Sequence, residues 1–276
     1  MEKHTSSVDA HYQKTGLYED ILARLQRMGI DPNKVTRKDI AGVDEFHVRG
    51  AEVSAELAAT ASLAGARVLD VGCGLGGPCR MLREVYDCHV TGIDLNQEYI
   101  RTARKLTELI GLSDCIEFVQ GDALALPFEK GSFDVVWTQH VQMNVRDKEK
   151  FYAAIKDVLK EKGTFLYYDI FSTGGEEINY PVPWANDASI SFLFTTAAFH
   201  SLLHEMGFAC VQTTDQTAKG IGFFESLFAR IQAQGLPALG LHALMGESAR
   251  VKLDNLLSGL KENKLTLQSG IYCKGG

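Results

Sequence analysis

From about residue 66 onward, short apolar runs alternate with helix-length amphipathic segments, and this rhythm constrains the fold more than any other feature of the chain. Short apolar runs are typical of strands buried on both faces, and each intervening segment is long enough for a helix that crosses back over the sheet. The pattern predicts an α/β chain with a doubly wound, Rossmann-like, mostly parallel seven-stranded sheet. Strands are expected at residues 67–71, 89–94, 116–119, 133–137 and 164–169, and near 209–212 and 265–273.

Helical segments are expected before the first strand and again before the last one. Residues 1–60 lack strand signals and predict a helical N-terminal cap, which leaves 61–276 as the main domain. Residues 170–195 contain Gly and Pro pairs that mark a long loop, and residues 215–262 predict a helical insertion before the last strand. Both are expected to be lids or substrate-region insertions, since long loops inside a compact domain are usually functional.

Composition narrows the range of partners. The net charge of -7 provides no basic surface for a phosphate backbone, so no nucleic-acid partner is expected. The N-terminus is polar, and no apolar stretch reaches the roughly 20 residues of a membrane helix. Six scattered cysteines show no spacing typical of a metal site. The sequence therefore predicts a cytoplasmic protein with no membrane partner and no metal.

A glycine-rich turn follows the first expected strand, where Gly72, Gly74, Gly76 and Gly77 lie within six residues. The spacing fits both G-x-G-x-x-G, typical of dinucleotide sites, and G-x-G-x-G. Each pattern leaves the backbone bare, so that a ligand can approach it between a strand and a helix. A tight turn with nothing bound is the alternative, although a turn alone does not require so many glycines.

Aspartates at three consecutive strand ends separate the two patterns. Asp70 lies two residues before Gly72, Asp94 closes the second strand and Asp122 follows the third. At these places a carboxylate could accept from an ammonium group, from both hydroxyls of a ribose and from an adenine amino group, respectively, whereas it would repel a pyrophosphate. The three acids suit a cationic, phosphate-free nucleoside. S-adenosylmethionine, which carries a sulfonium and an ammonium, meets that description.

Four motifs in this order resemble those of the class I S-adenosylmethionine-dependent methyltransferases. They are Val68–Gly77, Gly92–Leu95, Gly121–Ala123 with Leu126–Phe128, and Phe133–Val136. More narrowly, the chain resembles the small-molecule branch that includes sarcosine/dimethylglycine and ubiquinone/menaquinone-type methyltransferases. The resemblance covers roughly residues 44–212 and is specific for the cofactor but not for the methyl acceptor.

The resemblance implies a role for each matching position. The glycines would run along the methionine part of the cofactor, Asp94 would bind the ribose and Asp122 would lie near the adenine. Leu95 and Ala123 would flank the adenine ring, and Gln139 would line the methionine end. The implied cofactor-binding residues are Asp70, Gly72, Gly74, Gly76, Asp94, Leu95, Asp122, Ala123 and Gln139.

His140, just past the fourth strand, is the candidate catalytic residue. Methyl transfer is an in-line displacement that needs no nucleophilic side chain, and most of the acceleration can come from holding the acceptor in place and excluding water. A general base helps when the acceptor is a hydroxyl, a carbon acid or a protonated amine, and the ordinary pKa of histidine suits that task. The alternative is a histidine that only packs near the cofactor.

Several aromatic residues could form a chamber for the acceptor, although ordinary packing explains some of them equally well. The segment Asp44–Gly50 looks like the cap that closes over the cofactor in this branch. The candidates are Tyr12, Tyr18, Phe46 and His47 in the cap and Tyr180 and Trp184 in the long loop. A stripe at Phe223, Phe224, Leu227, Phe228 and Ile231 fits core packing or a dimer face as well as a substrate lid.

The function expected from these features is methyl transfer from S-adenosylmethionine to nitrogen, oxygen or carbon of a small molecule, by a protein that could form a homodimer. Two other functions remain open from the residues alone. One is a nicotinamide-dependent oxidoreductase that uses the other glycine pattern, and the second is a non-catalytic cofactor-binding protein.

Overall fold

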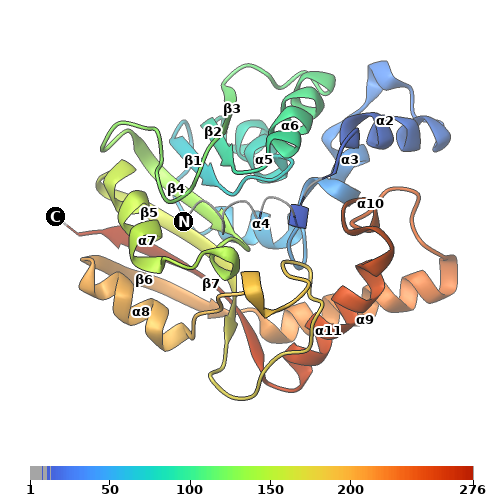
Figure 1. Cartoon of the computed structure of the whole chain (residues 1–276). Coiled ribbons are helices and arrows are strands. Elements are labelled where there is room, and N and C mark those ends of the chain that lie inside the picture. The colour runs from blue at the N-terminus through green and yellow to red at the C-terminus, as the bar shows by residue number, and fades with distance from the viewer. Residues whose placement is uncertain (1–7, 9–10, 13, 276) are drawn as a thin grey trace.

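The computed structural model describes Val8, His11, Tyr12 and residues 14–275. The part of the expected N-terminal cap that falls on the remaining residues lies outside this description. A seven-stranded sheet runs through the centre, flanked by helices on both faces (Figure 1).

The strands follow the order β3-β2-β1-β4-β5-β7-β6, in which β1 to β5 pair in parallel and β7 is antiparallel to both neighbours. The prediction of a mostly parallel seven-stranded sheet is confirmed. The bounds are β1 (Arg67–Val71), β2 (His89–Asp94), β3 (Ile116–Gln120), β4 (Phe133–Gln139), β5 (Leu159–Ser172), β6 (Phe208–Asp215) and β7 (Leu265–Lys274).

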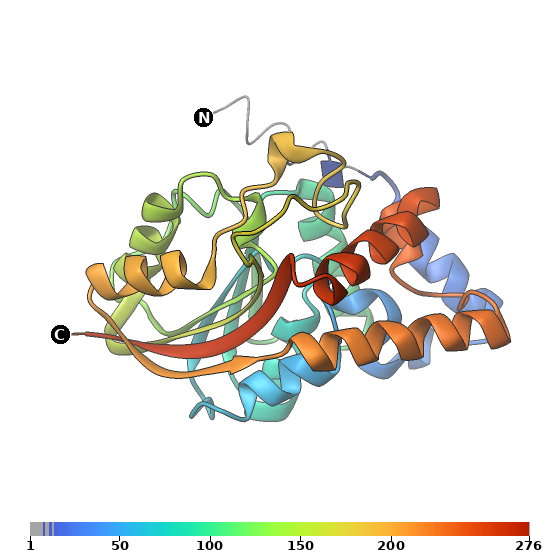
Figure 2. The ribbon, with the colours of Figure 1, turned by 90° about the horizontal axis from the view of Figure 1, so that it is seen from below.

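Helices occupy the segments predicted before the sheet and before its last strand. In the part of the chain that the structure describes, α2 (Leu17–Arg27), α3 (Arg37–Asp44) and α4 (Ala51–Ala58) precede β1. The crossover helices are α5 (Gly77–Tyr86), α6 (Gln97–Leu109), α7 (Lys148–Val158) and α8 (Thr196–Glu205). Between β6 and β7 lie α9 (Thr217–Gln234), α10 (His242–Met245) and α11 (Ala249–Lys261). Figure 2 shows α9 and α11 side by side, next to the curved β7.

Alternating side chains of the strands belong to two different cores. Val68 of β1 packs in the cluster that includes α4, α5, α9 and α11, whereas its neighbour Leu69 packs in the cluster with α7 and α8. Trp137 and Val136 of β4 divide in the same way. The period of two in a strand places neighbours on opposite faces, so both faces of the central strands are buried, whereas the edge strand β6 is mostly exposed. Each buried aliphatic side chain contributes about 1.5–3 kcal/mol to folding.

A third apolar cluster joins the N-terminal helices to the rest of the chain. Leu17, Ile21 and Leu25 recur every four residues and form one buried face of α2. This face packs with α6 and with Leu239 and Ala243 before and within α10. In Figure 1, α2 and α3 lie at the upper right, above α10.

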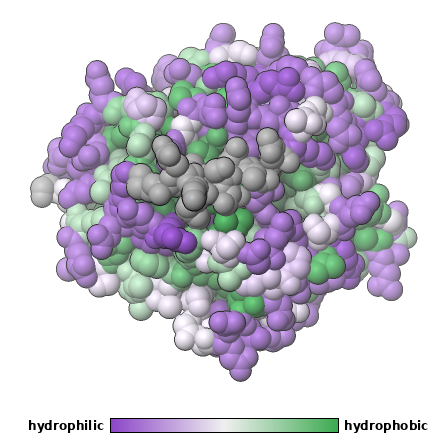
Figure 3. All heavy atoms as spheres, in the orientation of Figure 1, coloured by the Kyte–Doolittle hydropathy of each residue, from purple (hydrophilic) through white to green (hydrophobic). Residues whose placement is uncertain are grey.

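No helix among the described residues is long and apolar enough to cross a membrane. Hydrophilic and hydrophobic residues are interspersed across the face seen in Figure 3.

Candidate active site

One cavity lies at the carboxyl ends of β1 to β5, where the order of the sheet brings the predicted residues together. Ligands of doubly wound sheets bind at this edge, because the helices leave a crevice there. The predicted residues that line it are Asp70, Gly72, Gly74, Asp94, Leu95, Asp122, Ala123, Gln139 and His140. Gly76 is not among the lining residues.

The glycine turn brings bare backbone to the cavity. Gly72 and Gly74 have φ of +75° and +53°, a left-handed conformation that side chains adopt only with strain. A Cβ at Gly72 would lie 2.4 Å from a methyl carbon of Val141. Gly76, with φ of +82°, is required for a different contact, since a Cβ there would lie 2.6 Å from the ring of Phe118.

Backbone amides fix the carboxylates of β2 and of the segment after β3. Gly74 N donates to Asp94 Oδ2 and Asn96 N to Asp94 Oδ1, each over 2.9 Å. Leu124 N donates to Asp122 Oδ1 over 2.9 Å. These bonds orient both carboxylates at the cavity, next to the turn of β1.

Asp70 is the buried member of the three acids and is only 2% exposed. Burial raises the pKa of its carboxyl group to about 7, with smaller upward contributions from Asp94 and Glu45, although a hydrogen bond from Cys79 Sγ over 3.2 Å opposes the shift. The ionised carboxylate therefore lacks compensating positive charge in the described structure. A cation placed beside Asp70 would supply it.

The cap segment that begins at Asp44 lies directly on the start of α5. Arg80, fully buried, forms an ion pair with Asp44 and donates to Thr107 Oγ1 over 2.7 Å. A Cβ at Gly77 would lie 2.3 Å from the backbone oxygen of Asp44, so only glycine permits this approach. The segment that follows Asp44 is thereby held over the glycine turn.

Buried polar residues of the cap reach the end of β4. His47 Nε2 lies 3.0 Å from Glu45 Oε2, and Ser54 Oγ donates to the same carboxylate and, over 3.1 Å, to Gln139 Oε1. Burial opposes ionisation of Glu45, but the hydrogen bonds from His47 and Ser54 outweigh it and lower the pKa of Glu45. Trp137 Nε1 also donates to Gln139 Oε1 over 2.8 Å, which fixes the amide orientation.

Two side-chain nitrogens at this end of the cavity are buried and have no hydrogen-bond partner among the described residues. They are Gln139 Nε2 and His140 Nε2. Burial, with a smaller contribution from His47, holds the pKa of His140 well below its usual value, so its imidazole is neutral near pH 7. His140 also has φ of +52°, and its N–H donates to Tyr168 O over 2.8 Å. A buried polar atom without a hydrogen-bond partner costs free energy of folding. Two such atoms at one end of the cavity therefore point to a ligand that would pair with them.

The loop after β4 is anchored by two buried charged groups. Asp169 of β5 accepts from Val141 N over 3.2 Å and from Gln142 N over 3.1 Å. Lys148 Nζ donates to backbone oxygens of Val145 and Phe192, each over 2.6 Å. Burial raises the pKa of Asp169 to about 6 and lowers the pKa of Lys148 to about 7. This anchoring fixes the backbone that follows His140, while the backbone before it is held by the pairing of β4 with β5.

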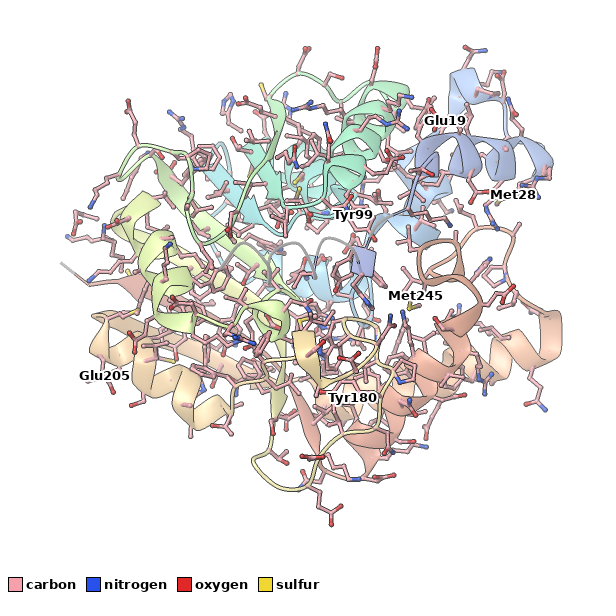
Figure 4. All side chains as sticks on the ribbon, in the orientation of Figure 1. Glu19, Met28, Tyr99, Tyr180, Glu205 and Met245 are labelled. Carbon is pink, nitrogen blue, oxygen red and sulfur yellow. The ribbon has the colours of Figure 1, made fainter. Side chains whose placement is uncertain are left out.

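Of the aromatic residues expected to form a chamber, some line the cavity and others do not. The lining ones are Tyr12, Phe46, His47 and Trp184, together with Phe223 and Phe224 of the stripe. Tyr18 instead lies under Lys105 Nζ, 4.6 Å from the ring centroid. Tyr180 packs against the core beside α11, and Figure 4 shows it well apart from Tyr99 of α6, which does line the cavity.

Part of the chain that forms the cavity matches a known protein family. Residues 69–167, from β1 into β5, match the family model described as a methyltransferase domain. The resemblance read from the four motifs is thereby confirmed.

Curated relatives match this chain over part of their length. Sterol 24-C-methyltransferase ERG6B of Gibberella zeae is 40% identical over 109 residues, which is 40% of this chain and 29% of that protein. Glycine/sarcosine/dimethylglycine N-methyltransferase of Actinopolyspora halophila is 30% identical over 149 residues, 54% of this chain and 26% of that protein. The chain thus matches less than a third of the length of these relatives.

Solved structures share the fold at lower identity. Phosphoethanolamine N-methyltransferase 2 of Haemonchus contortus, solved with S-adenosyl-L-methionine, matches with a TM-score of 0.69 and 18% identity over 91% of this chain and 59% of that chain. The [4+2]-cyclase SpnF matches with a TM-score of 0.65 and 20% identity over 94% of each chain. Proteins of different named chemistry therefore share this fold, and activity has to be argued from the site.

Sequence reasoning did not single out several residues that shape the cavity. Glu45 and Ser54 lie nine residues apart, and their link to Gln139 exists only because the cap folds onto the end of β4. Leu253 and Leu256 of α11 line the cavity although they lie far beyond the glycine turn in the sequence. The one local pattern that could have pointed to them is Glu45-x-His47, two polar side chains placed close together in an otherwise helical cap.

Proposed function

We propose that this protein binds S-adenosylmethionine in the cavity and transfers its methyl group to a small-molecule acceptor. The observation that carries the proposal is the presence of Asp70, Asp94 and Asp122 on one cavity beside the bare backbone of Gly72 and Gly74. Three carboxylates favour a cationic nucleoside and disfavour a diphosphate. The family match over residues 69–167 supports the same conclusion.

The described residues fit this cofactor. Asp94 would accept from the ribose hydroxyls and Asp122 would lie near the adenine, with Leu95 and Ala123 on its faces. The methionine part would run along Gly72 and Gly74, with Asp70 and the unpaired amide of Gln139 at its end. Gly76 stays in the turn as a support for Phe118 rather than as a cavity residue.

When bound, the cofactor supplies an electrophilic methyl on a sulfonium, and methyl transfer breaks the methyl–sulfur bond while a bond forms to the acceptor atom. The residues of the chain hold the cofactor and the acceptor in position and exclude water from the cavity. The ion pair between Arg80 and Asp44 holds the cap over the glycine turn, and the anchors Asp169 and Lys148 hold the loop that carries His140. A fixed acceptor and excluded water supply most of the acceleration in such a displacement.

His140 is proposed to accept the acceptor's proton where the acceptor has one to lose. Its neutral imidazole has an unpaired Nε2 in the cavity, which supports this role, while burial makes it a weak base. Asparagine tolerates a positive φ, so H140N tests the role without backbone strain. If His140 is the base, kcat of the wild-type protein should fall at low pH as the imidazole becomes protonated. H140N should lose this fall at low pH, and an unchanged dependence of kcat on pH would leave His140 a packing residue.

The decisive experiment measures cofactor affinity by calorimetry in the wild-type protein, Asp94→Ala and Asp94→Asn. Removal of charge-assisted bonds to the ribose should weaken binding about tenfold or more in Asp94→Ala, by roughly 1.4 kcal/mol or more. Asp94→Asn keeps the shape but loses the charge and one of the two acceptor oxygens, so it separates packing from the contribution of the carboxylate. Equal affinity in all three proteins would refute the proposed cofactor site.

Neither of the other two functions gains support. The matching family and the two relatives named above are methyltransferases, and the acidic cavity disfavours the pyrophosphate of a nicotinamide cofactor. A non-catalytic binding protein would retain cofactor affinity without turnover, and it is tested by a screen for methylated product.

We also propose the finer features of the assignment. The protein acts in the cytoplasm, on a small molecule rather than on nucleic acid or a membrane, and as a homodimer. Residues 1–60 form a cap domain, residues 61–276 form the methyltransferase domain, and residues 170–195 and 215–262 form its lids. The net charge of -7 supports the exclusion of nucleic acid. Sedimentation analysis tests the homodimer, and a monomer at all concentrations refutes it.

A further inference from the structure

The β5 side of the cavity has an apolar wall made by the helices before β7. We define the apolar chamber as Phe223, Phe224 and Leu227 of α9, Leu253 and Leu256 of α11, and Trp184 of the long loop. Both helices contact β7, which pairs with β5, whereas Asp70 lies in β1, Asp94 closes β2 and Asp122 follows β3. The cavity therefore changes from acidic to apolar along the edge of the sheet.

Hydrogen bonds between the walls connect the segments of the chamber. Asn255 Nδ2 of α11 donates to Pro181 O over 2.9 Å, and Asn144 Nδ2 donates to Trp184 O over 2.9 Å. Trp184 Nε1 donates to Ser191 Oγ over 2.9 Å, so the indole N–H is paired within the loop itself. The walls are joined before any ligand arrives, and they present mainly carbon to the cavity. A preformed apolar site of this kind binds hydrocarbon without a large ordering cost.

The cavity offers little to an anionic acceptor. Arg146 is the single Arg or Lys among the lining residues that the structure describes. It is exposed, and its guanidinium lies 4.8 Å from the ring centroid of Phe192. A carboxylate or a phosphate buried in the chamber would be left without a cationic partner, which is strongly unfavourable.

Hydrogen-bonding capacity is concentrated where the chamber meets the carboxyl end of β4. Gln139 is only 7% exposed, and its Nε2 has no partner among the residues described. An amide nitrogen carries two N–H groups, so one can donate to the methionine end of the cofactor and the other to the acceptor. His140 Nε2 is buried beside Gln139 in sequence and is likewise unpaired there. One polar group of a ligand at this point would pair with these nitrogens.

We propose that the methyl acceptor is an uncharged, mostly hydrocarbon molecule with one hydrogen-bonding group, which meets Gln139 and His140 while its body fills the apolar chamber. This inference rests on the proposed methyltransferase function and specifies the substrate class of the same site.

The test uses the full chain saturated with S-adenosylhomocysteine, so that binding is measured without turnover. Calorimetry compares 1-alkanols of four to ten carbons with alkanoates of the same lengths, and with sarcosine. Each added methylene should tighten alkanol binding by about three- to fourfold until the chamber is full. Alkanoates of equal length should bind at least about tenfold more weakly, because a buried anion is unpaired. Affinity that does not depend on chain length, or tighter binding of alkanoates or sarcosine, would overturn the inference.

A matched pair of variants locates the binding. Leu227 is half-buried in the chamber, and Leu202 of α8 is half-buried against the other core, outside the cavity. Leu227→Ser should weaken decanol binding about tenfold or more, while Leu202→Ser should leave it within about twofold. Equal effects of the two variants would contradict the chamber. The affinity for S-adenosylhomocysteine, measured in the same samples, reports folding.

The two proposals fail differently in this experiment. If S-adenosylhomocysteine does not bind to the wild-type protein, the proposed function fails. If it binds and alkanols show no dependence on chain length, only the substrate class fails.

Discussion

Asp70 is a buried carboxyl group whose ionisation depends on what lies beside it. Its pKa of about 7 in the described structure is far above the ordinary aspartate value, chiefly because burial disfavours the charge. The folded protein therefore holds a proton between about pH 4 and pH 7 that the unfolded chain has already lost. Across this window the contribution of Asp70 to stability falls as pH rises. A cationic ligand would reverse the preference by favouring the carboxylate.

Binding of S-adenosylmethionine is accordingly expected to release protons near pH 7. A group with a pKa of about 7 is half protonated at that pH, so ligand binding would release up to about half a proton from Asp70. Calorimetry in phosphate and in Tris, which differ in ionisation enthalpy, measures this release. The isosteric variant Asp70→Asn should abolish it, and an equal release in that variant would assign the proton to another group.

At the scale of elements, the contact between the cap and α5 depends on a missing side chain. The backbone oxygen of Asp44 occupies the space in which a Cβ of Gly77 would lie. Gly222 of α9 is also in a helix, but nothing lies within 4 Å of the corresponding position. The two glycines therefore have opposite tolerance for a methyl group.

Gly77→Ala should destabilise the protein by about 1–3 kcal/mol through overpacking and should weaken cofactor binding, since the cap must shift. Gly222→Ala should gain up to about 1 kcal/mol, because alanine is the better helix former. Urea unfolding with both variants measures the difference. Equal stability of the two proteins would contradict the close contact between the cap and α5.

Local patterns in the sequence predicted the elements that form locally. The run Arg67–Val71 and the glycines after it gave β1 and its turn, because the strand and the turn need nothing distant. The strand expected at residues 164–169 extends in fact over Leu159–Ser172. Pairing with β7 continues it to Ser172, and Leu159 at its start pairs with Phe133 of β4. The hydrogen bond between Ser54 and Gln139 joins residues 85 apart, which no local pattern encodes.

The site was predictable to the same degree. Strand-end aspartates could be located because a strand end is a local feature. Gly76 was expected on the ligand, but only the packed structure reveals that its absent side chain makes room for Phe118. The apolar chamber depends on α9 and α11 folding back beside β7, so its residues could not be assigned to a cavity from periodicity alone.

The whole molecule joins three apolar clusters around one cavity, so a ligand in the cavity should stabilise all of them together. Helices α2 and α3 contribute one cluster, and the two faces of the sheet contribute the others. The cavity is lined from each of the three, by Leu75, Phe224 and Ile93 for example. Ligand binding and global stability are therefore linked.

Saturation with S-adenosylmethionine at 100 times its Kd should add about 2.7 kcal/mol to the free energy of unfolding. For a chain of this size, that corresponds to a rise in Tm of about 5–10 °C. NADH at the same concentration should change Tm by less than about 1 °C, because the acidic cavity disfavours its pyrophosphate. Differential scanning fluorimetry measures both, and a larger shift with NADH would favour the oxidoreductase.

The division of the sheet into two cores has a consequence for how this protein could change during evolution. Phe224, Leu256 and Trp184 belong both to the chamber and to the core that includes α4 and α5, whereas the core beneath α7 and α8 has no part in the chamber. Substitutions that change which acceptor fits the chamber must alter residues of the first core, and they will therefore also lower the free energy of unfolding. The second core contributes Ile93 to the cavity but no residue to the chamber, so substitutions beneath α7 and α8 can compensate for lost stability while the chamber keeps its lining.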